Sequence, residues 1–145
     1  MIALLLVLGL GSIGTALAGG VPTVYKRASD KPFATVVSDL EFAITDRNFS
    51  IVGRNQIGRG IRAMGEAAPE AVVIQFCNLS VAHEAFSIAL DLIVYMPCRI
   101  SVYEDGHRVS VSAVLMPEDS SDARANAFAS KVNRQLRQMI NYAAR

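Results

Sequence analysis

The 145-residue sequence lacks tryptophan, has only two cysteines and two histidines, and has almost no net charge. Two cysteines are too few for a disulfide scaffold, and they do not have the spacing of a zinc finger. The 14 Lys and Arg residues balance 13 Asp and Glu residues, so the net charge of +1 gives no reason to expect a nucleic-acid partner. With 52% hydrophobic residues, a chain of this length is expected to form one domain with a substantial core.

An apolar run without a charged side chain opens the sequence, from Met1 to Ala18. Two interpretations of this run compete. Ala16-Leu17-Ala18 followed by Gly19 fits a signal-peptidase site, so that cleavage after Ala18 would release the domain into the periplasm. Alternatively, a helix of this length rises roughly 27 Å, which is near the lower limit for an uncleaved anchor that spans a bilayer. No Lys or Arg precedes the run, so the usual basic start of a signal peptide is missing.

Small residues within this run indicate how an anchor would pack. Gly11, Ser12 and Gly14 each begin a small-x-x-x-small pair, which allows a second helix to approach closely in lipid. We therefore expect residues 2–18 to lie in the lipid bilayer as a signal-anchor helix. The expected protein partners of this helix are other subunits of a membrane complex.

Two signals disagree about the orientation of such an anchor. Lys26 and Arg27 follow the run, and the positive-inside rule would place them in the cytoplasm. The Ala16-Leu17-Ala18 site favours export instead and is the more specific signal. We therefore expect a bacterial-type inner-membrane protein whose soluble domain lies on the periplasmic side.

The rest of the sequence predicts an α+β domain over residues 31–145, continuous with a linker and first strand over residues 19–30. Hydrophobic periodicity and turn residues predict the following elements: strand 23–26, a helix that ends near Asn48, strand 49–54, a helical turn over 57–64, strand 72–77, a helix capped by Ser80, a hairpin over 98–115 and a helix from Ala123. Ser29 or Asp30 is expected to cap the first of these helices. The order β-α-β-(short α)-β-α-β-β-α indicates a two-layer domain, in which helices cover one face of a mainly antiparallel sheet.

The hairpin over residues 98–115 carries the most explicit structural prediction. Asp105 and Gly106 are expected to form its two-residue turn. Three pairs follow from that turn: Glu104 with His107, Val102 with Val109, and Ile100 with Val111. Alternation then places the apolar side chains on one buried face, and Tyr103 and Arg108 on the other face.

Four short motifs together resemble a known family: Asn48-Phe49-x-Ile51-Val52-Gly53, Ile57-Gly58-x-Gly60-Ile61-Arg62, Phe76-Cys77-Asn78-Leu79 and Met96-Pro97-Cys98-Arg99. From about Val24 to Ala144, the chain is similar to the family catalogued as domain of unknown function 302. The resemblance implies a compact α+β fold that often forms a dimer, so a homodimer is one expected partner. It implies no reaction, and the apolar first 18 residues lie outside it.

The two cysteines are the main candidates for a site. Cys77 ends a strand and Cys98 begins one, so we expect both near one edge of the sheet. The functional interpretation is a redox, soft-metal or small-ligand site, with Asn78, Met96 and Arg99 as neighbouring candidates. The alternatives are two buried free thiols or a stabilising disulfide. We expect no bound metal and no other cofactor, because the further possible soft ligands, His83 and Met96, are too weakly placed to complete a site.

A second candidate is the glycine-rich segment at residues 57–62. Its backbone amides, with Arg59 and Arg62, could hold an anion, but the segment lacks the lysine and hydroxyl of a phosphate loop. A plain turn is the alternative. No catalytic set stands out, so we expect a non-catalytic, membrane-anchored accessory or binding domain within a larger membrane complex. The alternative function is a periplasmic thiol-redox, metal-handling or small-ligand-binding protein that uses Cys77 and Cys98.

Overall fold

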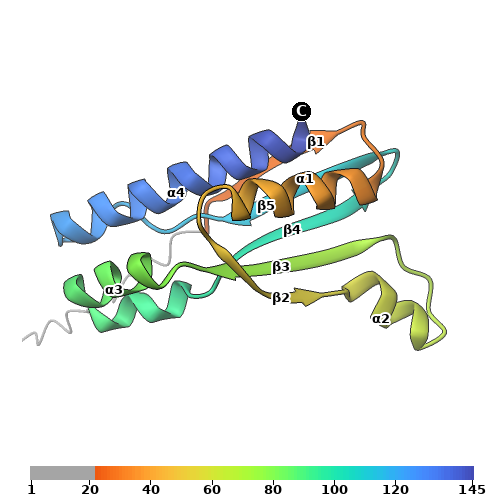
Figure 1. Cartoon of the computed structure of the whole chain (residues 1–145). Helices are drawn as coiled ribbons and strands as arrows, with labels where there is room; N and C mark the ends of the chain where they lie inside the picture. Colours follow the sequence, from red (N-terminus) through yellow and green to blue (C-terminus); the bar gives the residue numbers. More distant parts are fainter. Residues whose placement is uncertain (1–21) are drawn as a thin grey trace, which may run out of the picture.

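Strands and helices alternate along residues 22–145, the part of the chain that this computed structural model describes. The strands are β1 (Val24–Ser29), β2 (Ser50–Asn55), β3 (Ala71–Cys77), β4 (Cys98–Asp105) and β5 (Arg108–Val114). The helices are α1 (Phe33–Thr45), α2 (Ile57–Ala63), α3 (Leu79–Ile88), the 3-10 helix η1 (Leu90–Tyr95) and α4 (Ala123–Ala144). The strands form one antiparallel sheet in the order β1-β5-β4-β3-β2, which confirms the predicted α+β class and antiparallel sheet (Figure 1).

The expected anchor over residues 2–18, with Gly11, Ser12 and Gly14, lies outside the described residues. The same holds for the cleavage site after Ala18. Within residues 22–145, none of the helices combines the length and the apolar character that crossing a bilayer requires.

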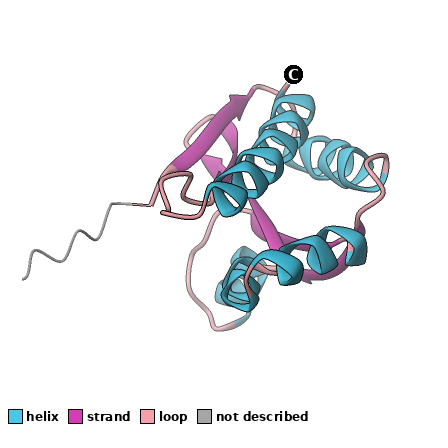
Figure 2. Ribbon diagram, turned by 90° about the vertical axis from the view of Figure 1, so that its left-hand side faces the viewer, coloured by secondary structure: helices cyan, strands magenta, loops and turns pink. Residues whose placement is uncertain are grey.

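Helices α1 and α4 pack against each other across one face of β1, β5 and β4, as Figure 2 shows. The predicted periodicity of both helices is confirmed. The buried side chains of α1 include Val36, Leu40 and Ile44, and those of α4 include Phe128, Val132, Leu136, Met139, Ile140 and Ala143. These side chains meet the inward-facing residues of the central strands, and together they form the hydrophobic core.

The β4–β5 hairpin buries the predicted face but uses a different turn. Ile100, Val102, Val109 and Val111 are all buried, and Arg108 is exposed. Val102 pairs with Val111 rather than with Val109, because the two loop residues are Gly106 and His107. Gly106 has a φ of +68°, which suits the glycine at the first loop position of a type II′ turn. The predicted pairing was therefore wrong by two residues, and a shift of two keeps every side chain on its face.

Two predicted helix caps are also wrong. Helix α3 begins at Leu79, and its N-cap is Asn78 rather than Ser80. Helix α1 begins after Pro32, without a side-chain cap from Ser29 or Asp30. Asn78 precedes the two backbone amides that need an acceptor, whereas Ser80 already lies inside the first turn.

Candidate functional site

The pairing of β3 with β4 sets the position of both cysteines. Phe76 on β3 lies opposite Cys98 on β4, and Cys77 is the next residue along β3. Strand β3 ends at Cys77 and β4 begins at Cys98, and the chain between them forms α3 and η1. The two cysteines therefore lie at the same end of these neighbouring strands, one at each end of this connection; we call this end of the strands the edge of the sheet. Both are free and half-buried.

A narrow apolar cavity lies beside the two cysteines, between the α3–η1 connection, the sheet edge and α4. Its lining residues are Phe49, Phe76, Cys77, Asn78, Val81, Ala82, Leu92, Tyr95, Met96, Cys98, Met116, Phe128 and Val132. The hollow contains about 340 Å³ of space free of atoms, including parts open to solvent. Only about 20 Å³ of it admits the centre of a water-sized sphere, so the cavity is closed to anything much larger than one water.

Burial, and with smaller effect the nearby Cys77 thiol, raises the pKa of the Cys98 thiol to about 11. A backbone hydrogen bond and the positive charge of Arg99 lower the pKa of Cys98, but with smaller effect. At neutral pH Cys98 is therefore a protonated thiol. Because the thiolate is the nucleophile in thiol–disulfide exchange, this environment makes Cys98 a poor redox centre.

The structure gives Asn78 a structural role at the entrance to α3. Its side-chain Oδ1 accepts hydrogen bonds from the backbone N–H groups of Ser80 and Val81, at 2.9 and 3.1 Å. Its Nδ2 donates to the backbone carbonyl of Asn48 at 2.7 Å. Asn48 has a φ of 60°, in the left-handed region that asparagine tolerates better than most residues. The side chain of Asn78 thus joins the turn before β2 to the start of α3.

The other residues proposed near the cysteines separate into two groups. Met96 lines the cavity, together with Met116, which the sequence did not indicate. Arg99 pairs with Gln75 and is exposed; it lines a hollow that also contains Ser101 and Ser112. His83 is exposed and does not line the cavity. Among the described residues, no group of three His, Cys, Asp or Glu side chains is placed to hold a metal ion.

Packing explains the first glycine and the second arginine of the segment at residues 57–62. A side chain on Gly58 would place its Cβ 2.1 Å from the backbone oxygen of Pro69, so only glycine fits there. The guanidinium of Arg62 donates to the carbonyls of Ala68 and Pro69 and forms an ion pair with Glu70 at 2.7 Å. Arg62 thereby holds the loop between α2 and β3. Arg59 is exposed on α2, and its proposed role with an anion stays a prediction.

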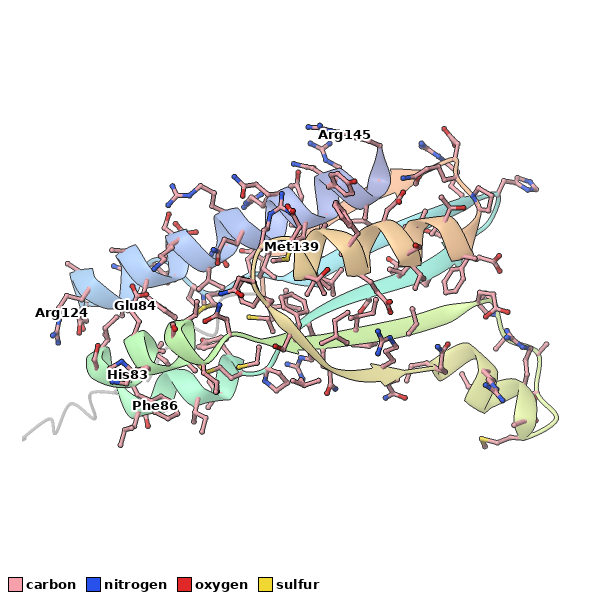
Figure 3. The ribbon with its side chains drawn as sticks, in the orientation of Figure 1. His83, Glu84, Phe86, Arg124, Met139 and Arg145 are labelled. Carbon is pink, nitrogen blue, oxygen red and sulfur yellow. The ribbon has the colours of Figure 1, made fainter. Side chains whose placement is uncertain are left out.

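Helices α3 and η1, with Ala89 between them, form a lid over the cavity; we use this term for residues 79–95. The lid is held by few buried side chains, because only Ala85 of α3 is buried and η1 has no buried residue. One ion pair, between Lys131 of α4 and Glu84 at 2.6 Å, joins α3 to the domain. Figure 3 shows Glu84 on the side of α3 that faces α4, and Phe86 pointing away from α4.

Comparisons with known proteins agree on one family. The family model described as "Domain of unknown function DUF302" matches residues 25–143. A solved structure described as "Crystal structure of uncharacterized conserved protein DUF302 from Bacillus stearothermophilus" is similar to this chain, with a TM-score of 0.76 and 15% sequence identity. The match covers 84% of this chain and 98% of that one, and at this identity it shows the fold alone. None of the curated proteins matches the chain.

Proposed function

The chain belongs to the family of the domain of unknown function DUF302, and within this fold we propose that it is a non-catalytic module that binds a small apolar ligand under the lid. The observation that carries the proposal is the cavity beside Cys77 and Cys98. Its lining is almost entirely aliphatic, aromatic and sulfur-containing. Such a surface favours an apolar guest, because a polar group would lose its hydrogen bonds to water there.

The closed cavity requires the lid to move before a ligand enters. The 20 Å³ open to a water-sized sphere is far below the roughly 300–1,000 Å³ of typical ligand sites. The lid packs Ala85 fully, and Val81, Ile88 and Leu92 partly, against the core, so it is expected to open at lower cost than the core itself, since local opening costs the contacts that it breaks. Ligand binding then replaces the inner contacts of Val81, Ala82 and Leu92 with contacts to the ligand.

The environment of Cys98 supports binding over redox chemistry. Its raised pKa keeps the thiol neutral, and a neutral thiol packs as a small apolar group. A redox pair needs a stabilised thiolate, which burial and the second thiol oppose. The thiols of Cys77 and Cys98, with Met96, therefore act in this proposal as soft, polarisable parts of the wall.

A cavity-filling variant tests the proposal. Ala82 lines the cavity, so Ala82→Phe should fill it, whereas Ser87→Phe adds the same ring at an exposed position of the same helix. The probe is the apolar dye N-phenyl-1-naphthylamine, whose emission rises in apolar sites. We expect dye binding to the parent chain and to Ser87→Phe, and loss of binding in Ala82→Phe with the fold retained by circular dichroism. Equal binding by Ala82→Phe would sink the proposal.

A second function, favoured by a separate observation, is a membrane tether through residues 2–18. The outer surface of the lid is apolar, and the described chain begins beside it, because Pro22, Thr23 and Tyr95 line one surface hollow. In this proposal the domain is an accessory subunit on the periplasmic side of a bacterial-type inner membrane. Its partners are other membrane subunits or a second copy of the chain. Intact mass of the purified protein tests the tether: a chain that begins at Gly19 would be a free periplasmic protein.

A further inference from the structure

The outer side of the lid exposes large apolar side chains in a short stretch. They are Leu79, Phe86, Leu90, Ile93 and Val94; Tyr95, which also lines the cavity, is partly exposed beside them. Leu79 is 84% exposed, and Leu90 and Val94 are 69% and 68% exposed. Single exposed apolar residues are ordinary on a protein surface, but a contiguous group on one segment marks an interaction site.

The position of the lid indicates what this surface contacts. Val94 and Tyr95 share a hollow with Val24 and Val114, which are also exposed, so the lid lies beside the first strand; polar side chains, Arg99 among them, line the same hollow. The backbone at Thr23 is fixed to this region, because Leu115 N–H donates to its carbonyl at 2.8 Å. The apolar sequence of residues 1–18 ends four residues before Pro22. Four residues of extended chain span at most about 14 Å.

The charges of the lid fit an uncharged, apolar partner. Residues 79–95 contain no Lys or Arg, and their two carboxylates belong to Glu84 and Asp91. Glu84 is already paired with Lys131. Attraction to a charged partner is therefore weak, and burial of the apolar side chains is the available driving force.

We propose that the outer surface of the lid rests in the lipid interface of the membrane that residues 2–18 enter. A helical segment can bury its apolar side chains in the headgroup region while its other face stays on the protein. This inference rests on the membrane tether proposed above. It also narrows the ligand class, because a lid with one side in lipid and the other over the cavity opens toward molecules dissolved in the membrane.

The absence of tryptophan makes a direct test available, since a single introduced tryptophan reports on its own surroundings. Ile93→Trp places the reporter on the lid. Met64→Trp is the matched control, because Met64 is 79% exposed and follows α2, which Figure 1 shows at the end of the molecule opposite the lid. Both full-length variants are reconstituted in phosphatidylcholine vesicles with and without bromine on the acyl chains, which quenches tryptophan at membrane depth.

We expect Ile93→Trp to lose most of its emission in brominated vesicles and to emit at shorter wavelength, while Met64→Trp changes little. The quenching should persist at about 0.5 M salt, because screening does not weaken apolar insertion. Vesicle-bound protein in which both reporters stay unquenched overturns the inference and leaves the tether intact. If the reporter of Ile93→Trp is shielded without lipid, and the shielding rises with protein concentration, the inference is overturned in favour of a second copy of the chain. Protein that does not float with the vesicles overturns the tether itself.

Discussion

Replacing Asn78 with alanine should loosen the lid and leave the other end of the domain unchanged. The side chain provides two acceptor contacts to the start of α3 and one donor contact to the carbonyl of Asn48. Loss of an asparagine N-cap costs about 1 kcal/mol, and loss of a single exposed hydrogen bond costs about 0.5–1 kcal/mol. The two together are about 2 kcal/mol, which corresponds to a roughly 30-fold change in an equilibrium constant.

Hydrogen exchange followed by mass spectrometry measures this change in separate segments. If the lid opens as its own unit, the amides of α3 should exchange about 10- to 30-fold faster in Asn78→Ala. Labelling of Cys98 at fixed pH should accelerate by a similar factor, because its thiol lies under the lid. The amides of α2, at the opposite end of the molecule, should keep their rates (Figure 1).

Asn78→Asp separates the two contributions of the side chain. Aspartate keeps the acceptor oxygen at the N-cap, and its negative charge suits a helix N-terminus, but it has no donor for the carbonyl of Asn48. We therefore expect a smaller effect than in Asn78→Ala. Unchanged α3 exchange in Asn78→Ala would show that the cap does not hold the lid. An equal acceleration in α2 would show that the side chain acts on the whole domain.

Three further predictions concern the core, the short helix and the buried thiol. Val102→Asp should destabilise the domain by about 4 kcal/mol or more in urea unfolding, because Val102 is fully buried; Ser101→Asp, on the other face of β4, should cost far less. Gly58→Ala should lower the melting temperature because its Cβ would meet a backbone oxygen at 2.1 Å, whereas Gly60→Ala, with nothing within 4 Å, should gain up to about 1 kcal/mol. Alkylation of Cys98 by iodoacetamide should be slow at pH 8 and rise until the pH passes its pKa of about 11. Folding raises the pKa of Cys98 from 9.0, so its contribution to the free energy of unfolding is fully present below about pH 9 and is lost between pH 9 and 11. Cys98→Ala should remove this fall in stability with pH.

The sequence predicted the parts of the fold that depend on periodic burial. The apolar face of α4 and the buried face of the β4–β5 hairpin follow directly from spacing, because a helix or strand that packs on one side must repeat its apolar residues. The pairing of the hairpin did not follow, since two registers bury the same face and differ only in the place of Gly106. The choice between them depends on the backbone conformation of one glycine.

The candidate site was only partly predictable, for a different reason. Adjacent antiparallel strands bring Cys77 and Cys98 to one edge, and that inference required only the strand ends. The cavity also needs Met116 and side chains of α4, which meet the cysteines through packing distant in sequence. Residues 89–95 gave no periodic signal, because η1 is short and exposes most of its apolar side chains instead of burying one face. The sequence indicates Asn78 only as a ligand candidate, because its role as a cap depends on where α3 begins.

The connection between β3 and β4 is the strongest reason to place the function at the lid. These strands are antiparallel neighbours, and a tight turn of two to five residues could join them. The chain instead inserts residues 78–97, and from α3 and η1 only Ala85 is fully buried. Such an insertion adds an entropic cost of loop closure to folding, and in return it packs only Ala85 and the partly buried Val81, Ile88 and Leu92 against the core. The inner side of this one covers the cavity beside Cys77 and Cys98, and its outer side is the largest group of exposed apolar residues on any segment of the described chain. A domain that needed only its sheet and the α1–α4 layer would have neither surface.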